Sequence, residues 1–139
     1  MNLERTFAII KPDAVAAGHA GEILAIVEQA GFRILALRLT RLTEQQAQAF
    51  YAVHSEKPFF AGLVKFMTEG PIVVMALERQ DAIRQWRQTM GATNPANAAE
   101  GTIRKRFATS IERNCVHGSD ARETAETELR FFFATADLL

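Results

Sequence analysis

Cysteine is nearly absent from this sequence, which has Cys115 alone among its 139 residues. One cysteine cannot build an intrachain disulfide framework, and together with three histidines it gives no spacing typical of a zinc site. No apolar run approaches the length of a membrane-spanning helix, and residues 1–5 (MNLER) show no signal-peptide pattern. We therefore expect a cytoplasmic protein with no metal ligands of its own.

Net charge is also missing, because 16 lysines and arginines balance 16 aspartates and glutamates. A neutral chain has no general electrostatic attraction to nucleic acids or acidic membranes, and the basic run at residues 104–106 (RKR) is too short to supply one. The sequence also has no P-loop, no GxGxxG fingerprint and no nucleophile elbow around Ser119. We expect neither nucleic acid nor a membrane as a partner.

What the sequence does contain is a regular alternation of apolar periodicities, which divides it into four strands with helices between them. Its length suits one domain, residues 1–139, with a sizeable core. A long irregular loop at residues 91–110 precedes the last strand. The predicted strands cover residues 6–10, 33–42, 72–77 and 111–116, and the predicted helices cover residues 22–30, 43–53, 59–67, 81–91 and 120–133.

This order of elements predicts an α/β (α+β) sandwich of the ferredoxin-like kind, in which helices pack on a four-stranded antiparallel sheet. A doubly wound parallel sheet is the alternative. The strand at residues 33–42 bears on the choice, since Leu35, Leu37 and Leu39 alternate with smaller or polar residues. Such alternation is typical of an antiparallel sheet with one wetter face, so we favour the antiparallel arrangement.

The stretch NCVHGSD at residues 114–120 places a histidine between an apolar strand and the start of a helix. Asp120 with Glu123 has the spacing of a capping box for that helix. Glu128 borders the apolar face of the helix, where a carboxylate is costly unless a group such as an imidazole N–H pairs with it. Spacing alone equally allows Glu128 to reach water. Because functional side chains are often presented at such loop ends, His117 is the first residue we single out.

Further polar side chains stand at unusual positions. Lys11 projects from the carboxyl end of the first strand, and Arg87 lies on the apolar stripe of its helix. The long loop contains Thr93, whose hydroxyl is a candidate ligand. It also contains Arg104, whose guanidinium is a candidate phosphate fork, a group that binds a phosphate through two parallel hydrogen bonds. Each has an ordinary alternative, such as a lysine capping a strand end or an arginine extending to water. Together, however, cations around a histidine suit phosphoryl transfer, in which a histidine can accept the group.

Several separate motifs, in the right order, resemble the nucleoside diphosphate kinase family. NCVHGSD is similar to the active-site signature of that family, and the resemblance extends over almost the whole chain. The matching stretches are FAIIKPDAV at 7–15, FY at 50–51 with His54, KPFF at 57–60, GATNP at 91–95, GTIR at 101–104 and NCVHGSD at 114–120. The resemblance implies a ferredoxin-like core and assembly into tetramers or hexamers.

The resemblance also implies a role for each residue singled out. His117 matches the phosphoacceptor, and Glu128 matches the carboxylate that orients it. Ser119 matches a neighbour that holds Glu128, and Tyr51 matches one that supports Lys11 and His117. The residues that match the nucleotide-binding set are Lys11, Phe59, Arg87, Thr93, Arg104 and Asn114.

The implied reaction is a ping-pong transfer of the terminal phosphoryl group from a nucleoside triphosphate to a nucleoside diphosphate, through a phosphohistidine at His117. Phe59 matches the residue that stacks on the base, and stacking tolerates every base, so ATP, GDP and other nucleotides are implied as substrates. Mg²⁺ is the implied cofactor, held mainly by the substrate phosphates.

Two differences from the family pattern concern the assembly. Ala16 and Ala17 replace a polar residue and an arginine of many members, and the chain ends soon after Phe133. Both differences bear on whether the assembly is a tetramer or a hexamer.

Two other functions stay open at this point. One is a catalytically silent, nucleotide-binding scaffold of the same fold, and the other is a phosphorelay domain that passes the group from histidine to a protein aspartate. A silent scaffold has no need for every catalytic position to be filled. A phosphorelay domain has no need for Phe59, Thr93 and the cations together. We therefore expect the kinase.

Overall fold

The computed structural model describes residues 3–138. Met1, Asn2 and Leu139, which begin and end the predicted single domain, lie outside the described residues. None of the described helices combines the length and the apolar character needed to cross a bilayer. In chain order the elements are β1 (Leu3–Ile10), α1 (Pro12–Ala16), α2 (Ala20–Gln29), β2 (Arg33–Thr40), α3 (Glu44–Phe50), the 3₁₀ helix η1 (Ala52–His54), α4 (Phe60–Met67), β3 (Ile72–Gln80), α5 (Ala82–Met90), the 3₁₀ helix η2 (Pro95–Asn97), α6 (Ile103–Phe107), β4 (Val116–Gly118), α7 (Arg122–Phe132) and the 3₁₀ helix η3 (Thr135–Leu138).

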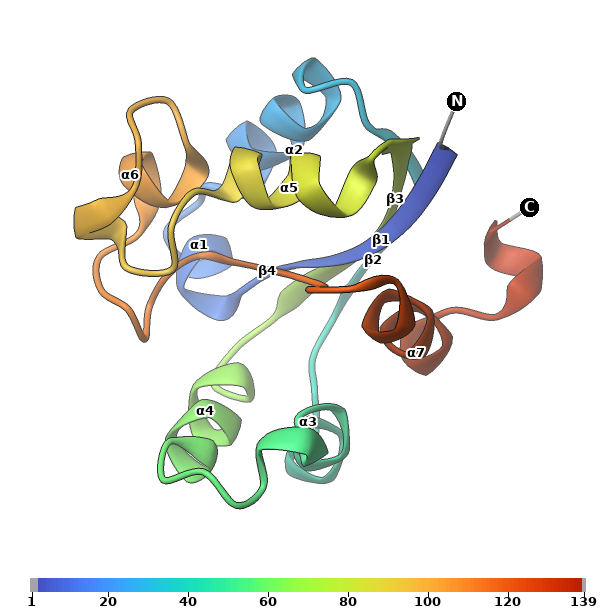
Figure 1. The fold of residues 1–139 in the computed structure, drawn as a ribbon. Helices are drawn as coiled ribbons and strands as arrows, with labels where there is room; N and C mark the ends of the chain where they lie inside the picture. The colour runs from blue at the N-terminus through green and yellow to red at the C-terminus, as the bar shows by residue number, and fades with distance from the viewer. Residues whose placement is uncertain (1–2, 139) are drawn as a thin grey trace.

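The four strands form one antiparallel sheet in the order β2-β3-β1-β4 (Figure 1). β1 lies in the interior of the sheet, where Ile9 is opposite Val74 of β3 on one side and His117 of β4 on the other. The ferredoxin-like prediction is confirmed, and the parallel alternative is wrong. The topology brings His117, near the end of the chain, beside the strand that begins it.

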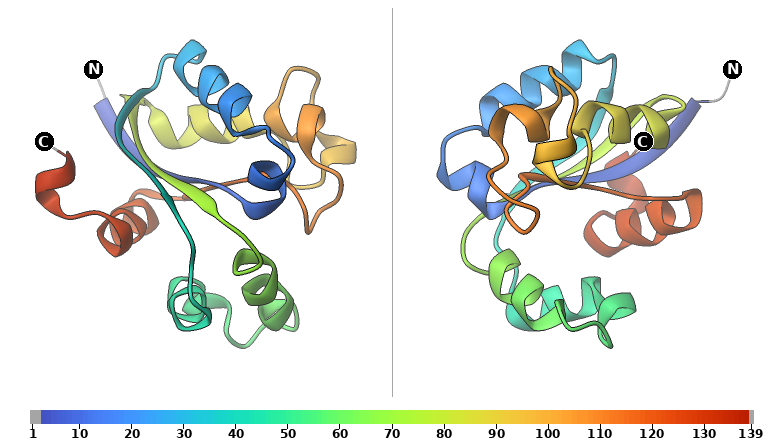
Figure 2. Two further views of the ribbon diagram at one scale, coloured as in Figure 1. Left: turned by 180° about the vertical axis from the view of Figure 1, so that it is seen from behind. Right: turned by 60° about the vertical axis from the view of Figure 1, so that its left-hand side comes forward.

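Helices cover both faces of the sheet, with α2 and α5 on one face and α3, α4 and α7 on the other (Figures 1 and 2). The alternation of side chains along β1 produces these two layers. Ile10 belongs to the core that includes Trp86 of α5, and Ile9 belongs to the core that includes Leu129 of α7. The continuous apolar run of β3 serves both cores, as expected of a strand covered on two sides.

β2 is an edge strand, and its pattern differs from the prediction. A β-bulge shifts the register between Ile34 and Ala36, so Leu35 and Ala36 pack against the same core. Leu37 is 50% exposed and Leu39 is 66% exposed. The regular alternation of one covered and one wetter face therefore fails along the outer half of this strand.

The segment between α5 and β4 also differs from the prediction. The expected irregular loop contains η2 and the short helix α6, which begins where the Thr102 hydroxyl accepts the Lys105 amide. The last strand is only Val116–Gly118, because Cys115 has a positive φ of 75° that interrupts extended pairing. Ile111, predicted to lie in that strand, is half exposed.

The predicted cap of α7 is wrong, and α5 also begins without a side-chain cap. α7 begins at Arg122, and the Thr124 hydroxyl accepts the amide of Ala121, so Asp120 and Glu123 do not form the capping box. Asp81 precedes α5 in a left-handed conformation, with its carboxylate bound to Arg84 and not to the helix N-terminus. The residues between the first strand and α2, expected to be a loop, include the five-residue helix α1.

Candidate active site

A cleft of about 1100 Å³ opens beside the carboxyl end of α5. Five of the residues singled out in the sequence line it, from four different parts of the chain. They are Arg87, Thr93, Arg104, His117 and Glu128. The antiparallel fold thus brings together five of the predicted side chains, which are up to 41 residues apart in the chain, whereas Lys11, Phe59 and Asn114 do not line the cleft.

His117 and Glu128 form the central contact of the cleft. Nε2 of His117 lies 3.0 Å from Oε1 of Glu128, and the Ser119 hydroxyl donates to the same carboxylate oxygen at 2.7 Å. Glu128 therefore faces the histidine, and of the two interpretations of its spacing the paired one is confirmed. Because a carboxylate only accepts, Nε2 carries the proton and Nδ1 keeps its lone pair.

Aromatic rings surround the His117 imidazole on the side of α3. The rings of Phe7, Phe50 and Tyr51 have centroids 6.2, 5.6 and 6.2 Å from the His117 ring, and all three are in edge-on arrangements. The Tyr51 hydroxyl is buried and has no hydrogen-bond partner among the described residues. Burial, reinforced by the nearby Glu128 carboxylate, raises the pKa of Tyr51 above its ordinary value. Tyr51 is thus a neutral neighbour of His117, but it makes no hydrogen bond to Lys11.

Lys11 is buried behind the cleft, where its ammonium donates to Oδ1 of Asn114 at 2.9 Å. The amide of the Asn114 side chain donates in turn to the carbonyl of Thr93 at 3.3 Å. Burial, with the positive charge of Arg104, lowers the pKa of Lys11 from 10.5 to about 8. A buried ammonium paired only with an amide has capacity left for an anion.

Arg104 is tied to the backbone of the site. Its guanidinium donates to the carbonyls of Gly91, Asn114 and Val116 at 3.0, 3.3 and 2.8 Å. Burial and the charge of Arg87 lower its pKa to about 10. The phosphate-fork role stays a prediction, and these contacts show a second use: Arg104 fixes the segment that leads to His117. Arg87 and Thr93 are exposed in the cleft.

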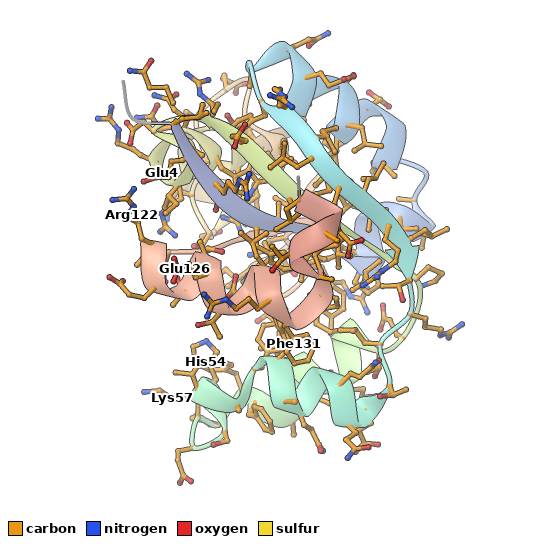
Figure 3. The ribbon with its side chains drawn as sticks, turned by 90° about the vertical axis from the view of Figure 1, so that its right-hand side faces the viewer. Glu4, His54, Lys57, Arg122, Glu126 and Phe131 are labelled. Atoms are coloured by element: carbon orange, nitrogen blue, oxygen red, sulfur yellow. The ribbon has the colours of Figure 1, made fainter. Side chains whose placement is uncertain are left out.

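Phe59 lies outside the set of residues that line the cleft. Its side chain is 53% exposed, and its ring centroid is 5.5 Å from that of His54, whereas Phe60 packs against the core. The Phe59 ring is therefore exposed, as the base stacking implied by the resemblance requires, and its stacking role stays a prediction. Figure 3 shows His54 and Lys57 at the end of the helix pair, beneath α7, with Phe131 between α7 and α3.

Sequence reasoning missed three residues that hold His117 in place. The Trp86 indole N–H donates to the His117 carbonyl at 3.2 Å. Gly118 lies directly against Trp86 and leaves no room for a side chain. Asp13 accepts the amide of Cys115 at 3.1 Å. The glycine after the histidine was a usable signal for close packing, but nothing in the spacing linked residues 13 and 115.

Comparison with known proteins shows to which family the chain belongs. The family model for nucleoside diphosphate kinase matches residues 4–138. The chain belongs to the nucleoside diphosphate kinase family. Relatives with that name from Syntrophotalea carbinolica and Oleidesulfovibrio alaskensis are 61% and 56% identical, over 99% and 97% of this chain and 100% and 97% of theirs.

Solved structures of the family agree with the fold described above. The Aquifex aeolicus nucleoside diphosphate kinase is 42% identical and has a TM-score of 0.96, with 99% of both chains covered. A halophilic nucleoside diphosphate kinase from Halobacterium salinarum, solved in complex with CDP, is 42% identical and has a TM-score of 0.93, with 98% of this chain and 91% of that chain covered. The chain is thus an enzyme of phosphoryl transfer, as the sequence predicted, and not a silent scaffold.

Proposed function

We propose that this chain moves the terminal phosphoryl group of a nucleoside triphosphate to a nucleoside diphosphate, with His117 as the covalent carrier. The observation that carries the proposal is the 3.0 Å contact between His117 Nε2 and Glu128 inside a cleft that also presents Arg87 and Arg104. A nucleophile with an oriented lone pair, surrounded by cations, suits the transfer of a charged phosphoryl group.

In the first half-reaction, the Nδ1 lone pair of His117 attacks the terminal phosphorus. The bond to the bridging oxygen breaks, and the diphosphate leaves with that electron pair. Because Nε2 keeps its proton, the phosphorylated ring becomes cationic, and the Glu128 carboxylate stabilises this charge. The Ser119 hydroxyl holds Glu128 in place for this purpose.

In the second half-reaction, a terminal oxygen of another diphosphate attacks the same phosphorus and the bond to Nδ1 breaks. The His117–Glu128 pair returns to its starting protonation state, so no proton is consumed over the cycle. Lys11, Arg87, Thr93, Arg104 and Asn114 are the proposed phosphate and sugar contacts. Phe59 offers an exposed ring on which any base can stack, which supports low base selectivity.

We propose Mg²⁺ as the cofactor and treat it as part of the nucleotide substrate. Mg²⁺ keeps most of its waters and is commonly bound through substrate phosphates, where it neutralises charge. The described cleft fits such a ligand, since Glu128 is engaged by His117 and Ser119 and the remaining charged groups include several cations. We also propose that residues 1–139 act as one domain, and we place the protein in the cytoplasm because its single cysteine is buried and unpaired.

A homo-oligomer, tetrameric or hexameric, is the proposed assembly. The support comes from β2, an edge strand of the described sheet with Leu37 and Leu39 exposed on it. Unpaired strand edges with apolar side chains favour pairing with another chain. A second copy that presents the same edge would cover both leucines.

The proposal is tested by the intact mass of the protein after brief exposure to ATP and Mg²⁺. We expect the wild type to gain one acid-labile phosphoryl group that GDP removes, and His117→Ala to gain none. His54→Ala and His19→Ala serve as matched controls and are expected to gain the group. Absence of a gain in folded wild-type protein would refute the proposal, and a gain in His117→Ala would assign the carrier to another residue.

A further inference from the structure

The turn that precedes β4 contains a strained residue between two parts of the site. Cys115 has a positive φ of 75°, a region that residues other than glycine seldom occupy. On one side of it Asn114 binds the Lys11 ammonium, and on the other side Val116 leads directly to His117. The conformation of Cys115 therefore sets how the Lys11–Asn114 pair is placed relative to the histidine.

Both backbone groups of Cys115 are held from the corner between β1 and α1. Its carbonyl accepts the amide of Lys11 at 2.7 Å, and its amide donates to Oδ2 of Asp13 at 3.1 Å. Arg104 holds the carbonyls on either side of Cys115, those of Asn114 and Val116. A guanidinium has no hydrogen-bond acceptor, so Arg104 cannot bind the Cys115 amide. Asp13 supplies the acceptor for that amide.

The carboxylate of Asp13 is itself placed at a cost. Its other oxygen, Oδ1, is buried and accepts no N–H or O–H group among the described residues, and the Cys115 thiol is the remaining donor beside this carboxylate, which together with burial raises the pKa of that thiol. A buried charged oxygen without an N–H or O–H partner destabilises a fold, although the charges of Lys11 and Arg113 act on this carboxylate. Such a cost indicates that the position of Asp13 serves the neighbouring site as well as helix α1.

We propose that Asp13 is a positioning residue whose carboxylate oxygen holds Cys115 at its positive φ, at the centre of a turn closed by the Val116 amide and the Asn114 carbonyl, and thereby keeps the Lys11–Asn114 pair aligned with His117 for phosphoryl transfer. This inference rests on the proposed function for its kinetic consequence. It has a structural consequence as well, because the Cys115 amide must be protected by Asp13 whatever the reaction is.

Two substitutions separate this role from a contribution of Asp13 to helix α1 alone. Asp13→Ala removes the acceptor, whereas Asp13→Asn keeps an acceptor oxygen in nearly the same place. We expect the single-turnover rate of His117 phosphorylation to fall about tenfold or more in Asp13→Ala, since a misplaced site loses alignment. We expect Asp13→Asn to stay within about threefold of the wild type, at a temperature where both variants are folded by circular dichroism.

A third substitution tests the strain directly. Glycine adopts positive φ freely, so Asp13→Ala should cost clearly less in the Cys115→Gly background than in the Cys115→Ala background, which also lacks the thiol but keeps the strained φ. An equal loss in both backgrounds would overturn the proposal. Equal rates in Asp13→Ala and the wild type, or an equal loss in Asp13→Asn and Asp13→Ala, would also overturn it.

Amide hydrogen exchange over residues 114–117 gives a readout that does not depend on activity. We expect faster exchange of the Cys115 amide in Asp13→Ala and near-normal exchange in Asp13→Asn. Unchanged exchange in Asp13→Ala would refute the positioning role. A wild type that is not phosphorylated would instead refute the proposed function, and the exchange result would still decide whether Asp13 holds the turn.

Discussion

At the scale of single residues, the site gathers positive charge that burial makes costly. Lys11 is buried and faces the guanidinium of Arg104, while Asp13 and Cys115 oppose the lowering of its pKa. Its ammonium is bound to the neutral side chain of Asn114 and not to a carboxylate. A bound phosphate would supply the missing negative charge, so nucleotide binding and the protonation of Lys11 are linked.

This linkage predicts a pH dependence. In the free enzyme Lys11 has a pKa of about 8 against an ordinary 10.5, so it loses its charge as the pH rises through about 8. We expect kcat/KM to decline above that pH, and kcat to decline only at higher pH because bound phosphate raises the pKa of Lys11. Lys11→Arg should move the decline in kcat/KM upward by about one pH unit or more, since arginine stays charged. Steady-state rates between pH 6 and 10 check this, and an unmoved decline in Lys11→Arg would assign it to another group.

The lowered pKa of Lys11 also predicts how the stability of the folded state changes with pH. Between pH 8 and 10.5 the unfolded chain holds a proton on Lys11 that the folded chain has lost. The folded state therefore gains stability from this group as the pH rises through that window. As the pH rises and Lys11 loses its proton, we therefore expect activity to fall and the stability contributed by Lys11 to rise.

At the scale of elements, the position of His117 depends on contact between β4 and α5. The strand β4 has only three residues, so its pairing with β1 alone does not fix it firmly. The Trp86 indole adds a hydrogen bond to the His117 carbonyl, and Gly118 lets the indole approach the backbone. The helix that presents Arg87 to the cleft therefore also holds the strand that carries the histidine.

Replacement of this glycine tests the contact. In Gly118→Ala the new Cβ would lie 2.7 Å from Trp86 Nε1 and 2.8 Å from Met90 Cε. We expect a loss of about 1–3 kcal/mol in the free energy of unfolding and a marked fall in activity, because the strand must shift. Gly62→Ala in α4 is the matched control: no atom lies within 4 Å, and we expect a gain of about 0.5–1 kcal/mol. Urea unfolding of both variants measures the difference, and similar stabilities would contradict the role of this contact.

Periodicity predicted the elements well where one residue type repeats on one face. The strands at β1 and β3 and the amphipathic helices α2 and α5 followed from their apolar spacing. Periodicity failed where the backbone conformation of one residue determines where an element ends. Cys115 has a positive φ that ends the predicted last strand, and no local signal marks a cysteine for that conformation.

Part of the candidate site could also be predicted from the spacing of residues in the sequence. Spacing gave the pairing of His117 with Glu128 as one of two equal interpretations, because both residues lie within a short stretch of chain, and the structure shows that the two side chains are paired. Contacts made across the fold were out of reach: Trp86 reads as a core residue, and Asp13 is 102 residues from Cys115. The family resemblance supplied the set of residues, but only the three-dimensional arrangement shows that Arg104 is occupied by backbone carbonyls.

At the scale of the whole molecule, the two edges of the sheet are treated differently. The outer side of β4 is covered, since Arg104 binds the carbonyl of Val116 there. The outer side of β2 has exposed leucines and no neighbouring strand in the described sheet. One edge therefore serves the site, and the other is available for the proposed assembly.

Lysine substitutions on β2 test this division. We expect Leu37→Lys combined with Leu39→Lys to shift the protein to a smaller species in sedimentation velocity, because a two-fold pairing would place added positive charges opposite one another beside Arg38. Ile111→Lys is the control, since Ile111 is 52% exposed, lies outside β2 and does not line the cleft that contains His117. An unchanged mass in the double variant would place the interface elsewhere. A smaller species with the His117 phosphorylation rate of the wild type would show that each copy contains a complete site, whereas a parallel loss of rate would show that assembly holds the cleft in its working shape.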